Sequence, residues 1–568
     1  MDKKTKIAIV GIVIAILVLT IGIGVTVVKR IIPSKEIMPL NEYYQVKDNE
    51  VLIILQDEIY DKYGIMADQK VYIDYDTVAN EFNHRFYWDS NENILTYTTP
   101  TEIIQADAAS NKYTVTKSMI KTEMSSDYPI LKLFGDKVYV ALDFVQKYSD
   151  MQYRFYTEPN RVVIEYKWGD YLFTEVGKAT QLRFKPDIKS PVLVQLSVGE
   201  ELMYIVKDEA PKKGFVKVMT QDGVIGYVKE KHLKESYYKT KGSAYQAPEY
   251  TSLTRSEKIN LVFHQIFNKD AGAKLEELIR QTKGVNVVSP TWFSITDVSG
   301  TISSLASHEY VEKAKALGLE VWALVDDFSN NVDMYELLSY TSRRENLSNA
   351  LVEAAIQYKI NGINIDFEKI PSKAGEHFIQ FIRELSVKCR NNGIVLSVDN
   401  YVPAPYNKYY NRKEQGEIVD YIIVMAYDEH HAGSDVIGPV ASLDYVKSAI
   451  DNTLEEVPKE KTIIAIPFYS RLWKETKEGE VSSESFAMTP AAKIFSDNNV
   501  ELKWDAAVGS YFGEYEKDGA VYKMWLEDEK SIEEKMKLIY EADLAGVGAW
   551  KLGLEKEEVW NVIIRYMN

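Results

Sequence analysis

The sequence predicts a multidomain chain that ends in a closed barrel of parallel strands. From about residue 256, short apolar runs alternate with amphipathic segments eight times, which indicates a repeated strand and helix unit. A polar linker at 239–250 separates this half from shorter strand-rich repeats, and an uncharged apolar run at 7–28 precedes them. These three observations predict one membrane-spanning helix, followed along the chain by two smaller modules and then by an α/β barrel.

Eight strands alternating with helices are typical of a (β/α)8 TIM barrel. Helical spacing of apolar residues marks the intervening segments, such as 343–359 and 443–457. The longest connection, 472–530, follows the seventh strand and is expected to be an insertion. The predicted strands are 259–263, 286–290, 320–325, 362–367, 394–398, 421–427, 462–468 and 546–550.

The composition supports packed domains and excludes several partners. The chain has 568 residues, of which 46% are hydrophobic, and its net charge of -17 argues against binding to nucleic acid. The single cysteine, Cys389, excludes an intrachain disulfide and is expected to be a buried thiol. His430 and His431 are adjacent and would point to opposite sides of a strand, so we expect no metal site and no cofactor.

The amino-terminal segment is expected to anchor the chain in a bacterial cell membrane. Residues 7–28 carry no charge and are long enough to cross a hydrocarbon layer of ~30 Å. Basic residues flank this run on both sides, so charge alone does not orient it. The run is too long for a typical cleaved signal peptide, so we expect a single-pass, uncleaved signal-anchor within residues 1–30. The nearly cysteine-free body favours placing the chain from residue 31 outside the cell.

An internal repeat follows a linker at 31–55 and predicts an α+β repeat module at 56–167. Residues 70–87 and 137–156 both begin with Lys-Val-Tyr, continue with helical spacing and reach Arg-Phe-Tyr. The arrangement resembles the amino-terminal domain of copper-amine-oxidase-like bacterial surface proteins. That resemblance implies a spacer or a wall-contact module, and we expect no copper here.

Residues 168–238 are predicted to form a small all-β barrel, because short apolar runs alternate with turn residues. The segment resembles a bacterial SH3-like domain. The resemblance implies either binding of peptidoglycan peptides or a spacer, and both remain open. A linker at 239–254 leads to the barrel at 255–568.

The fourth predicted barrel strand carries an unusual row of polar residues. In Ile-Asn-Gly-Ile-Asn-Ile-Asp-Phe-Glu (360–368) the apolar positions are expected to pack outward, and Asn364, Asp366 and Glu368 to point inward toward the carboxyl end. Asp366 and Glu368 would be close enough that one keeps its proton near neutral pH. A protonated acid at a pocket rim is what glycosidic bond cleavage needs. The alternative, a wet edge strand, conflicts with its place inside the βα series.

These residues resemble the Asp-x-x-Asp-x-Asp-x-Glu signature of glycoside hydrolase family 18. Supporting motifs follow in order, at 419–430 (VDYIIVMAYDEH), at 466–473 (IPFYSRLW) and at Trp550. The likeness covers about residues 255–568 and is strongest to the bacterial spore-cortex and cell-wall N-acetylglucosaminidase-like subgroup. It implies hydrolysis with retained configuration, in which the substrate's own 2-acetamido oxygen attacks the anomeric carbon and forms an oxazolinium ion.

The resemblance also implies roles for five residues. Glu368 would be the general acid and then the base that activates water, while Asp366 would orient the acetamide. Tyr427 would hydrogen-bond the acetamido carbonyl, with Asp428 near the sugar. Trp550 would form the apolar floor under the ring.

The sequence departs from the signature at two positions. Asn361 and Asn364 replace the first two aspartates. Asn364, a candidate substrate-binding residue, cannot share a proton with Asp366 as a carboxyl group could, so the acidity of Glu368 could differ. Asn361 lies at the entrance of the strand and is expected to serve structure.

Five further residues are candidates for substrate binding, and each has a structural alternative. Trp292 could cap the barrel core, and Tyr469 and Arg471 could brace a loop. Asn400 and Tyr401, which follow the fifth predicted strand, could contact substrate or serve structure.

The expected function is a membrane-anchored extracellular glycoside hydrolase that cuts β-1,4 bonds at N-acetylglucosamine in peptidoglycan. A chitinase acting on chitin-type oligosaccharides and a non-catalytic wall-binding lectin are the alternatives. The lectin is disfavoured because Glu368 is present.

Overall fold

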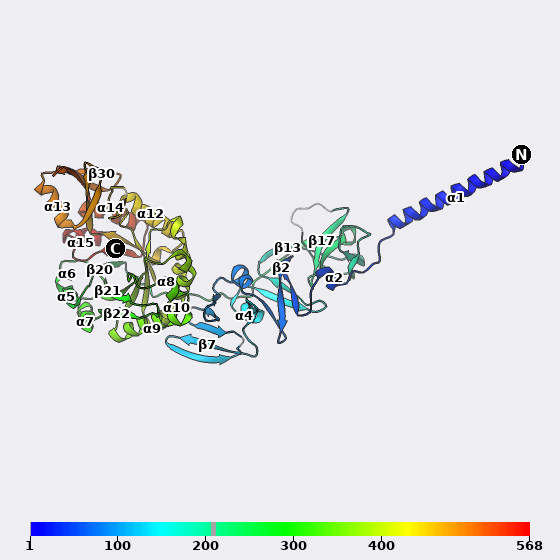
Figure 1. Ribbon diagram of the computed structural model, residues 1–568, viewed down its shortest axis with the longest axis horizontal. Coiled ribbons are helices and arrows are strands. Elements are labelled where there is room, and N and C mark those ends of the chain that lie inside the picture. Colours follow the sequence, from blue (N-terminus) through cyan, green and yellow to red (C-terminus); the bar gives the residue numbers. More distant parts are fainter. Residues whose placement is uncertain (1, 109, 206–211, 435, 568) are drawn as a thin grey trace. The chain divides into compact units, whose positions relative to one another are not determined.

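The structure is a computed structural model that describes residues 2–108, 110–205, 212–434 and 436–567, with the side chains of 22–29 left out. Residues 206–211, in the predicted SH3-like segment, therefore lie outside the described residues. The chain divides into two compact units. Figure 1 colours both along the sequence. Unit 1 contains Met1–Phe86, Ala108–Asn111 and Ser126–Ala247, and unit 2 contains Tyr87–Asp107, Lys112–Ser125 and Pro248–Asn568.

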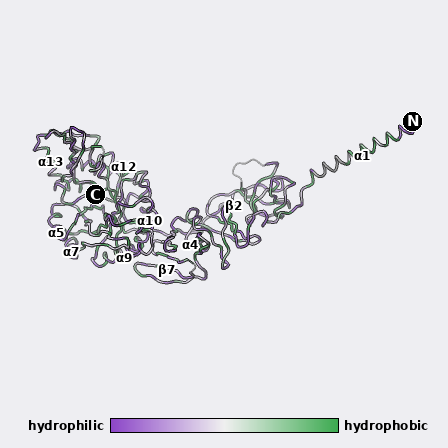
Figure 2. The backbone as a smooth tube through the Cα atoms, in the orientation of Figure 1, coloured by the Kyte–Doolittle hydropathy of each residue, from purple (hydrophilic) through white to green (hydrophobic). Residues whose placement is uncertain are grey.

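The amino-terminal helix α1 (Lys3–Ile31) is apolar, as predicted. Its segment Lys3–Ile21 has a mean hydropathy of 2.3 and is, among the described residues, the one helix long and apolar enough to span a membrane. Figure 2 shows hydrophobic residues along it. Signal sequences pass the same test of length and hydropathy.

Unit 1 contains two seven-stranded sheets. In the first, the two repeated Lys-Val-Tyr segments form β3 and β10, which pair antiparallel with Tyr139 opposite Asp74. The second sheet is antiparallel throughout and includes the predicted small β segment. The first sheet has the order β11 (Gln152–Tyr156), β12 (Arg161–Glu165), β1 (Glu50–Leu55), β2 (Glu58–Ala67), β3 (Lys70–Asp74), β10 (Lys137–Ala141) and β9 (Leu131–Phe134); its helices are α3 (Tyr75–Thr77), η1 (Val78–Phe82) and α4 (Leu142–Tyr148). The second has the order β15 (Val192–Leu196), β14 (Thr180–Arg183), β18 (Ile225–Lys229), β17 (Phe215–Thr220), β16 (Glu201–Tyr204), β13 (Gly169–Glu175) and β19 (Tyr237–Lys241).

Unit 2 contains the predicted closed barrel of eight parallel strands, and this prediction is confirmed. Pairing of the first strand with both the second and the last closes the barrel. Its strands follow the order of the chain around the ring, so all carboxyl ends lie at one rim. They are β20 (Ile259–His264), β21 (Val287–Ile295), β23 (Glu320–Asp326), β24 (Gly362–Asp366), β25 (Val395–Tyr401), β26 (Tyr421–Met425), β27 (Thr462–Pro467) and β33 (Gly546–Trp550).

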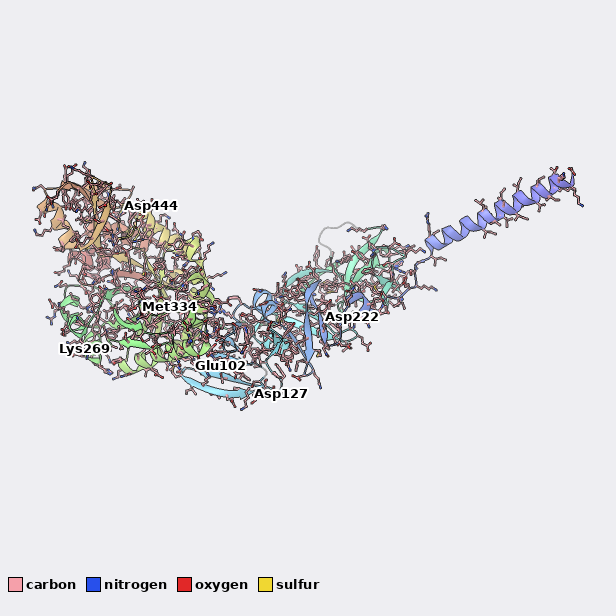
Figure 3. All side chains as sticks on the ribbon, viewed as in Figure 1. Glu102, Asp127, Asp222, Lys269, Met334 and Asp444 are labelled. Carbon is pink, nitrogen blue, oxygen red and sulfur yellow. The ribbon has the colours of Figure 1, made fainter. Side chains whose placement is uncertain are left out.

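Side chains alternate between two cores along each barrel strand. Ile363, Ile365 and Phe367 belong to the outer core, between strands and helices, as predicted for the fourth strand. Cys389 is buried in the same core. The surrounding helices include α7 (His308–Ala316), α8 (Met334–Leu338, its first residue marked in Figure 3), α9 (Thr341–Tyr358), α10 (Gly375–Asn391), α11 (Arg412–Ile418), α12 (Leu443–Leu454), α14 (Glu529–Glu541) and α15 (Glu558–Ile563).

The long connection after the seventh strand forms a sheet of its own, in the place predicted for an insertion. Five antiparallel strands build it, and one helix packs against them through Ala491 and Phe495. The sheet has the order β29 (Val481–Ala487), β28 (Tyr469–Thr476), β32 (Ala520–Leu526), β31 (Ser510–Lys517) and β30 (Lys503–Asp505), with α13 (Met488–Asp497).

A second five-stranded sheet belongs to the barrel unit although it lies far earlier in the sequence. Asp89 Oδ2 accepts hydrogen bonds from the backbone nitrogen of Thr341 at 2.6 Å and from its hydroxyl at 2.7 Å, at the start of α9. The buried Arg344 bonds Glu384 and donates to the Tyr87 hydroxyl at 3.2 Å. The two units thus divide residues 56–167 between them. The strands of this sheet are β4 (Tyr87–Asp89), β5 (Ile94–Thr98), β6 (Ile103–Asp107), β7 (Lys112–Lys117) and β8 (Ile120–Ser125).

Candidate active site

The polar row of the fourth strand points into the barrel at the rim where the strands end. Asn364 is fully buried, Asp366 is 5% exposed, and Glu368 is half-buried just beyond the end of β24. The alternation between the two faces of the strand produces this row, as the sequence predicts.

The Glu368 side chain is hydrogen-bonded by a tyrosine of the neighbouring strand β25. The Tyr401 hydroxyl donates to Glu368 Oε2 at 2.7 Å. Burial raises the pKa of Glu368, the bond from Tyr401 opposes this, and the negative charge of Asp428 raises the pKa further. The carboxyl group therefore keeps its proton to a higher pH than an ordinary glutamate, which suits a proton donor.

Asp327, directly after β23, fixes the backbone that carries Glu368. Its two carboxylate oxygens accept from the backbone nitrogens of Glu368 and Lys369, both at 2.9 Å. Burial raises the pKa of Asp327 to about 6. Sequence reasoning missed this residue, although the signal was present: two consecutive acids follow the third predicted strand.

Asp366 has its strongest charge neighbour on the next strand. Burial raises its pKa well above the ordinary value, the charge of Asp399 adds to this, and Glu368 follows. The sequence predicted an interaction between Asp366 and Glu368; the structure adds Asp399, which acts more strongly. Asp399 was also missed, because the fifth strand was predicted to end at residue 398, whereas β25 continues to Tyr401 and Asp399 bonds the inward Asn364.

Asn364 connects the two strands below these acids. The Ser397 hydroxyl donates to Asn364 Oδ1, and Asn364 Nδ2 donates to Asp399 Oδ2, both at 2.7 Å. Asn364 is fully buried and both ends of its amide are engaged, so the structure places it behind the acids rather than at the surface that a sugar would meet.

Tyr427 and Trp550 border the same interior. Both are partly exposed and pack on the inner barrel core. Burial, followed by the charges of Asp399 and Asp366, raises the pKa of the Tyr427 hydroxyl, which places Tyr427 in the acids' environment. The Trp550 ring lies 5.4 Å from that of Phe263, centroid to centroid.

Asp428, Tyr469 and Arg471 form one hydrogen-bonded group at the rim. Asp428 Oδ1 accepts from the Tyr469 hydroxyl at 2.6 Å and from Arg471 Nη2 at 3.5 Å. Asp428 is exposed, whereas Tyr469 and Arg471 are buried. The structure thus brings together three residues that the sequence placed on two separate motifs.

Two candidates lie on the outer faces of their strands. Asn400 Nδ2 donates to Gln415 Oε1 of α11 at 2.8 Å, because Asp399 and Tyr401 take the inward positions. Trp292 is 2% exposed and packs edge-to-face on Tyr310 of α7, with the ring centroids 4.9 Å apart. The structure therefore does not bring Asn400 or Trp292 to the site.

Two other predicted features concern structure and metals. Asn361 Oδ1 accepts from the backbone nitrogen of Val321 at 3.0 Å, which fits the structural role expected for it. Across the part of the chain that the structure describes, no three His, Cys, Asp or Glu side chains cluster as metal ligands would.

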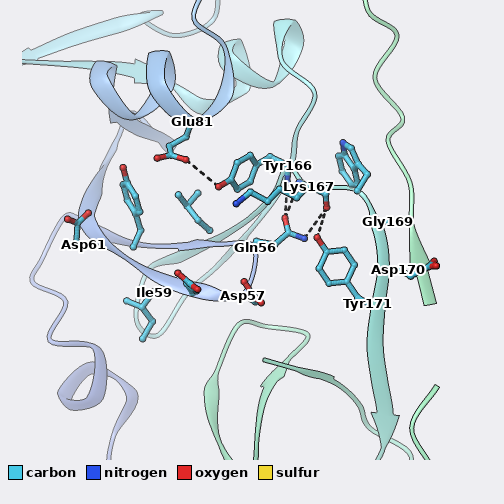
Figure 4. Close-up of a pocket in the computed structure, with 14 residues that line it drawn as sticks. Gln56, Asp57, Ile59, Asp61, Glu81, Tyr166, Lys167, Gly169, Asp170 and Tyr171 are labelled. Atoms are coloured by element: carbon cyan, nitrogen blue, oxygen red, sulfur yellow. Dashed lines mark hydrogen bonds between the residues drawn. The ribbon is translucent and has the colours of Figure 1, made fainter. Parts of the chain in front are cut away.

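A cleft of about 650 Å³ in unit 1 offers different chemistry (Figure 4). Gln56 at its base is buried and bonds the backbone of Tyr166 and Lys167, and the Tyr166 hydroxyl donates to Glu81 at 3.3 Å. Of the acids that line the cleft, none is buried: three, including Asp61, are exposed to water and two are half-buried. The buried, mutually interacting acids lie in the barrel instead, so the barrel rim is the candidate active site.

Comparisons with known proteins agree with this choice. Residues 237–555 match the family described as "Glycosyl hydrolases family 18". The protein named "Putative sporulation-specific glycosylase YdhD" of Bacillus subtilis (strain 168) is 30% identical over 234 residues, which cover 40% of this chain and 55% of that protein. The "Cortical fragment-lytic enzyme" of the same organism is 27% identical over 243 residues, covering 41% and 56%.

The chain spans little more than half the length of these relatives. Among solved structures, the Bacillus cereus spore cortex-lytic enzyme SleL aligns with a TM-score of 0.50 and 18% identity, covering 66% of this chain and 90% of that chain. This likeness shows the shared fold.

Proposed function

Because the chain belongs to glycosyl hydrolase family 18, we propose that it cuts β-1,4 bonds at N-acetylglucosamine in peptidoglycan. One observation carries the proposal: Glu368 is a half-buried acid with a raised pKa at the rim of a closed barrel, beside the buried Asp366. Such an acid can protonate the departing sugar oxygen as the glycosidic bond breaks.

The reaction would retain configuration and use the substrate's own acetamido group. Glu368 gives its proton to the leaving oxygen while the acetamido oxygen attacks the anomeric carbon, and the resulting carboxylate then takes a proton from the attacking water. Asp366 faces the positive charge that develops on the oxazolinium ion. Tyr427 would hydrogen-bond the acetamido carbonyl, and Trp550 would support the sugar ring.

Further sugar contacts would come from the rim. The group of Asp428, Tyr469 and Arg471 is held together by hydrogen bonds, so it offers fixed polar atoms to sugar hydroxyls.

The names of the relatives support wall glycan as the substrate, since one is a cortical fragment-lytic enzyme. Helix α1 would hold the protein in a bacterial cell membrane as a single-pass anchor, with the barrel outside the cell. The SH3-like and repeat modules between them would then bind the wall or set the reach of the enzyme.

The proposal is tested by digestion with the full chain in detergent micelles. Purified peptidoglycan, chitin oligosaccharides and de-N-acetylated wall glycan are the three substrates, and mass spectrometry identifies the products. We expect reducing-end N-acetylglucosamine fragments from peptidoglycan and none from the de-N-acetylated glycan, which lacks the attacking group. Faster cleavage of chitin oligosaccharides would identify a chitinase, and binding without products between about pH 4 and 8 would identify a lectin.

A further inference from the structure

Two buried carboxyl groups lie side by side in the barrel interior. The register of β24 and β25 sets Asn364 beside Ser397 and Ile365 beside Val398, so its next step sets Asp366 beside Asp399. Neighbouring strands are ~4.8 Å apart, whereas positions two apart on one strand are separated by ~6.6 Å. Asp399 is therefore a nearer neighbour of Asp366 than Glu368 is.

The surroundings of this pair are dry and acidic. Asp366 is 5% exposed and Asp399 3% exposed, and Oδ1 of each has no hydrogen-bond partner among the described residues. Two buried carboxylates this close repel each other strongly, so the pair holds one proton between them. The ionisable groups that act on the pair from the packed strands are acids and phenols: Asp326, Asp327, Glu368, Tyr401 and Tyr427.

Hydrogen bonding decides which of the two keeps the proton at rest. Ser397 donates to Asn364 Oδ1, which turns the amide so that Nδ2 donates to Asp399 Oδ2. A donated hydrogen bond favours the charged form of a carboxyl group. Burial raises the pKa of both groups well above the ordinary value, and the bond from Asn364 opposes this at Asp399 alone, so it favours the negative charge on Asp399 and the proton on Asp366.

We propose that Asp399 is a positioning residue that controls the charge of Asp366 during the reaction, an inference that rests on the proposed function. When positive charge develops on the acetamido group of the bound sugar, the proton moves from the Asp366 carboxyl to an Asp399 carboxylate oxygen. Asp366 becomes the carboxylate that faces the cation, Asp399 becomes neutral, and the net charge of the pair stays at one negative charge. The neighbouring strand thus supplies a proton-sharing partner for Asp366, which Asn364 cannot be.

The first test is Asp399→Asn, which keeps the shape and leaves an oxygen to accept from Asn364. Asp366 must then ionise without a neighbouring carboxylate to take up its proton. We expect kcat on peptidoglycan to fall at least about tenfold and the acidic limb of kcat/KM to move up by about one pH unit. A fall in kcat with an unmoved limb would mean a merely structural role and would overturn the proposal.

Exchanging the two groups is the matched rescue. Asn364→Asp combined with Asp399→Asn again provides one acid and one amide, joined by a hydrogen bond and adjacent to Asp366. We expect the double variant to be at least about fivefold more active than Asp399→Asn alone, whereas Asn364→Asp alone adds a third buried acid and loses activity. A double variant no better than Asp399→Asn would contradict proton sharing.

A third measurement does not depend on hydrolysis and so separates this inference from the proposed function. A carboxyl group whose folded pKa is raised binds more protons when folded, so it lowers stability as pH rises above its unfolded pKa of ~4. Asp399→Asn removes one of the two carboxyl groups that cause this loss. The Tm of the variant minus the Tm of the wild type should therefore increase as the pH rises from 4 to 7. A difference in Tm that stays constant over this range would overturn the proposal that the pair shares a proton, even if the wild type hydrolyses glycan. An inactive wild type that shows the expected trend in Tm would refute only the proposed hydrolysis.

Discussion

Tyr401 is the side chain through which the proton affinity of Glu368 can be changed with little other disturbance. Its hydroxyl donates to Glu368 Oε2 at 2.7 Å, and its ring packs edge-to-face on Tyr410 with centroids 6.2 Å apart. Tyr401→Phe removes the hydroxyl and keeps the ring. Because the lost hydrogen bond favoured the carboxylate, the already raised pKa of Glu368 should rise further.

The size of this effect follows from the geometry. A hydrogen bond to a charged group contributes about 1.5–3 kcal/mol, which corresponds to about 1–2 pKa units. Glu368 is only half-buried, so water replaces part of the lost bond and the lower end applies. The alkaline limb of kcat/KM, where Glu368 loses its proton, should therefore move up by about one pH unit.

The assay is the release of reducing ends from peptidoglycan, measured as kcat/KM between pH 4 and 10. The matched control is Tyr410→Phe, which removes a hydroxyl that donates to the backbone oxygen of Phe367 at 2.9 Å instead of to the catalytic carboxyl. The control should leave the alkaline limb unmoved. If Tyr401→Phe lowers the rate but leaves its own alkaline limb in place, the assignment of that limb to Glu368 is refuted.

Three further predictions concern the backbone of Glu368, the start of helix α9 and the proposed sugar floor. Asp327→Asn should lower kcat about tenfold or more, since its amide leaves one backbone N–H at 368–369 without an acceptor; an unchanged kcat would show that the Glu368 backbone needs no such support. Asp89→Ala should lower the free energy of unfolding of the barrel unit by about 2 kcal/mol, measured in urea, because the buried Asp89 caps the first backbone nitrogen of α9. The control Glu92→Ala removes an exposed hydrogen bond to the backbone nitrogen of Ser342 in the same turn and should cost under about 1 kcal/mol. Equal losses of stability in the two variants would show that burial does not strengthen the bonds that Asp89 makes to α9. Trp550→Ala should reduce kcat/KM about tenfold with folding preserved; an unchanged value would remove Trp550 from the sugar floor.

The barrel was predictable from the sequence because its signal is local. Strand and helix periodicities repeat along the chain, and alternation along one strand is enough to place Asp366 and Glu368 on the inner face. The same rule separates Asp399 from Asn400: one position along β25 turns a side chain from the acids to α11.

The lateral contacts were not predictable, because register between strands does not appear in a single strand's pattern. Asp399 meets Asp366 only through the pairing of β24 with β25, and Asp327 meets the Glu368 backbone only through the third strand. The contact of Asp89 with Thr341 spans 252 residues of sequence and likewise follows from packing alone.

The central claim is that Glu368 delivers a proton to a departing sugar oxygen, and Glu368→Gln tests it most directly. Glutamine keeps the shape and can still accept from Tyr401, but it has no proton to give at any pH. Digestion of peptidoglycan by the full-length variant, followed by reducing-end release, should fall at least about a thousandfold, with glycan binding and Tm within error of the wild type. A folded variant that still cuts within tenfold of the wild-type rate would show that the proton comes from elsewhere.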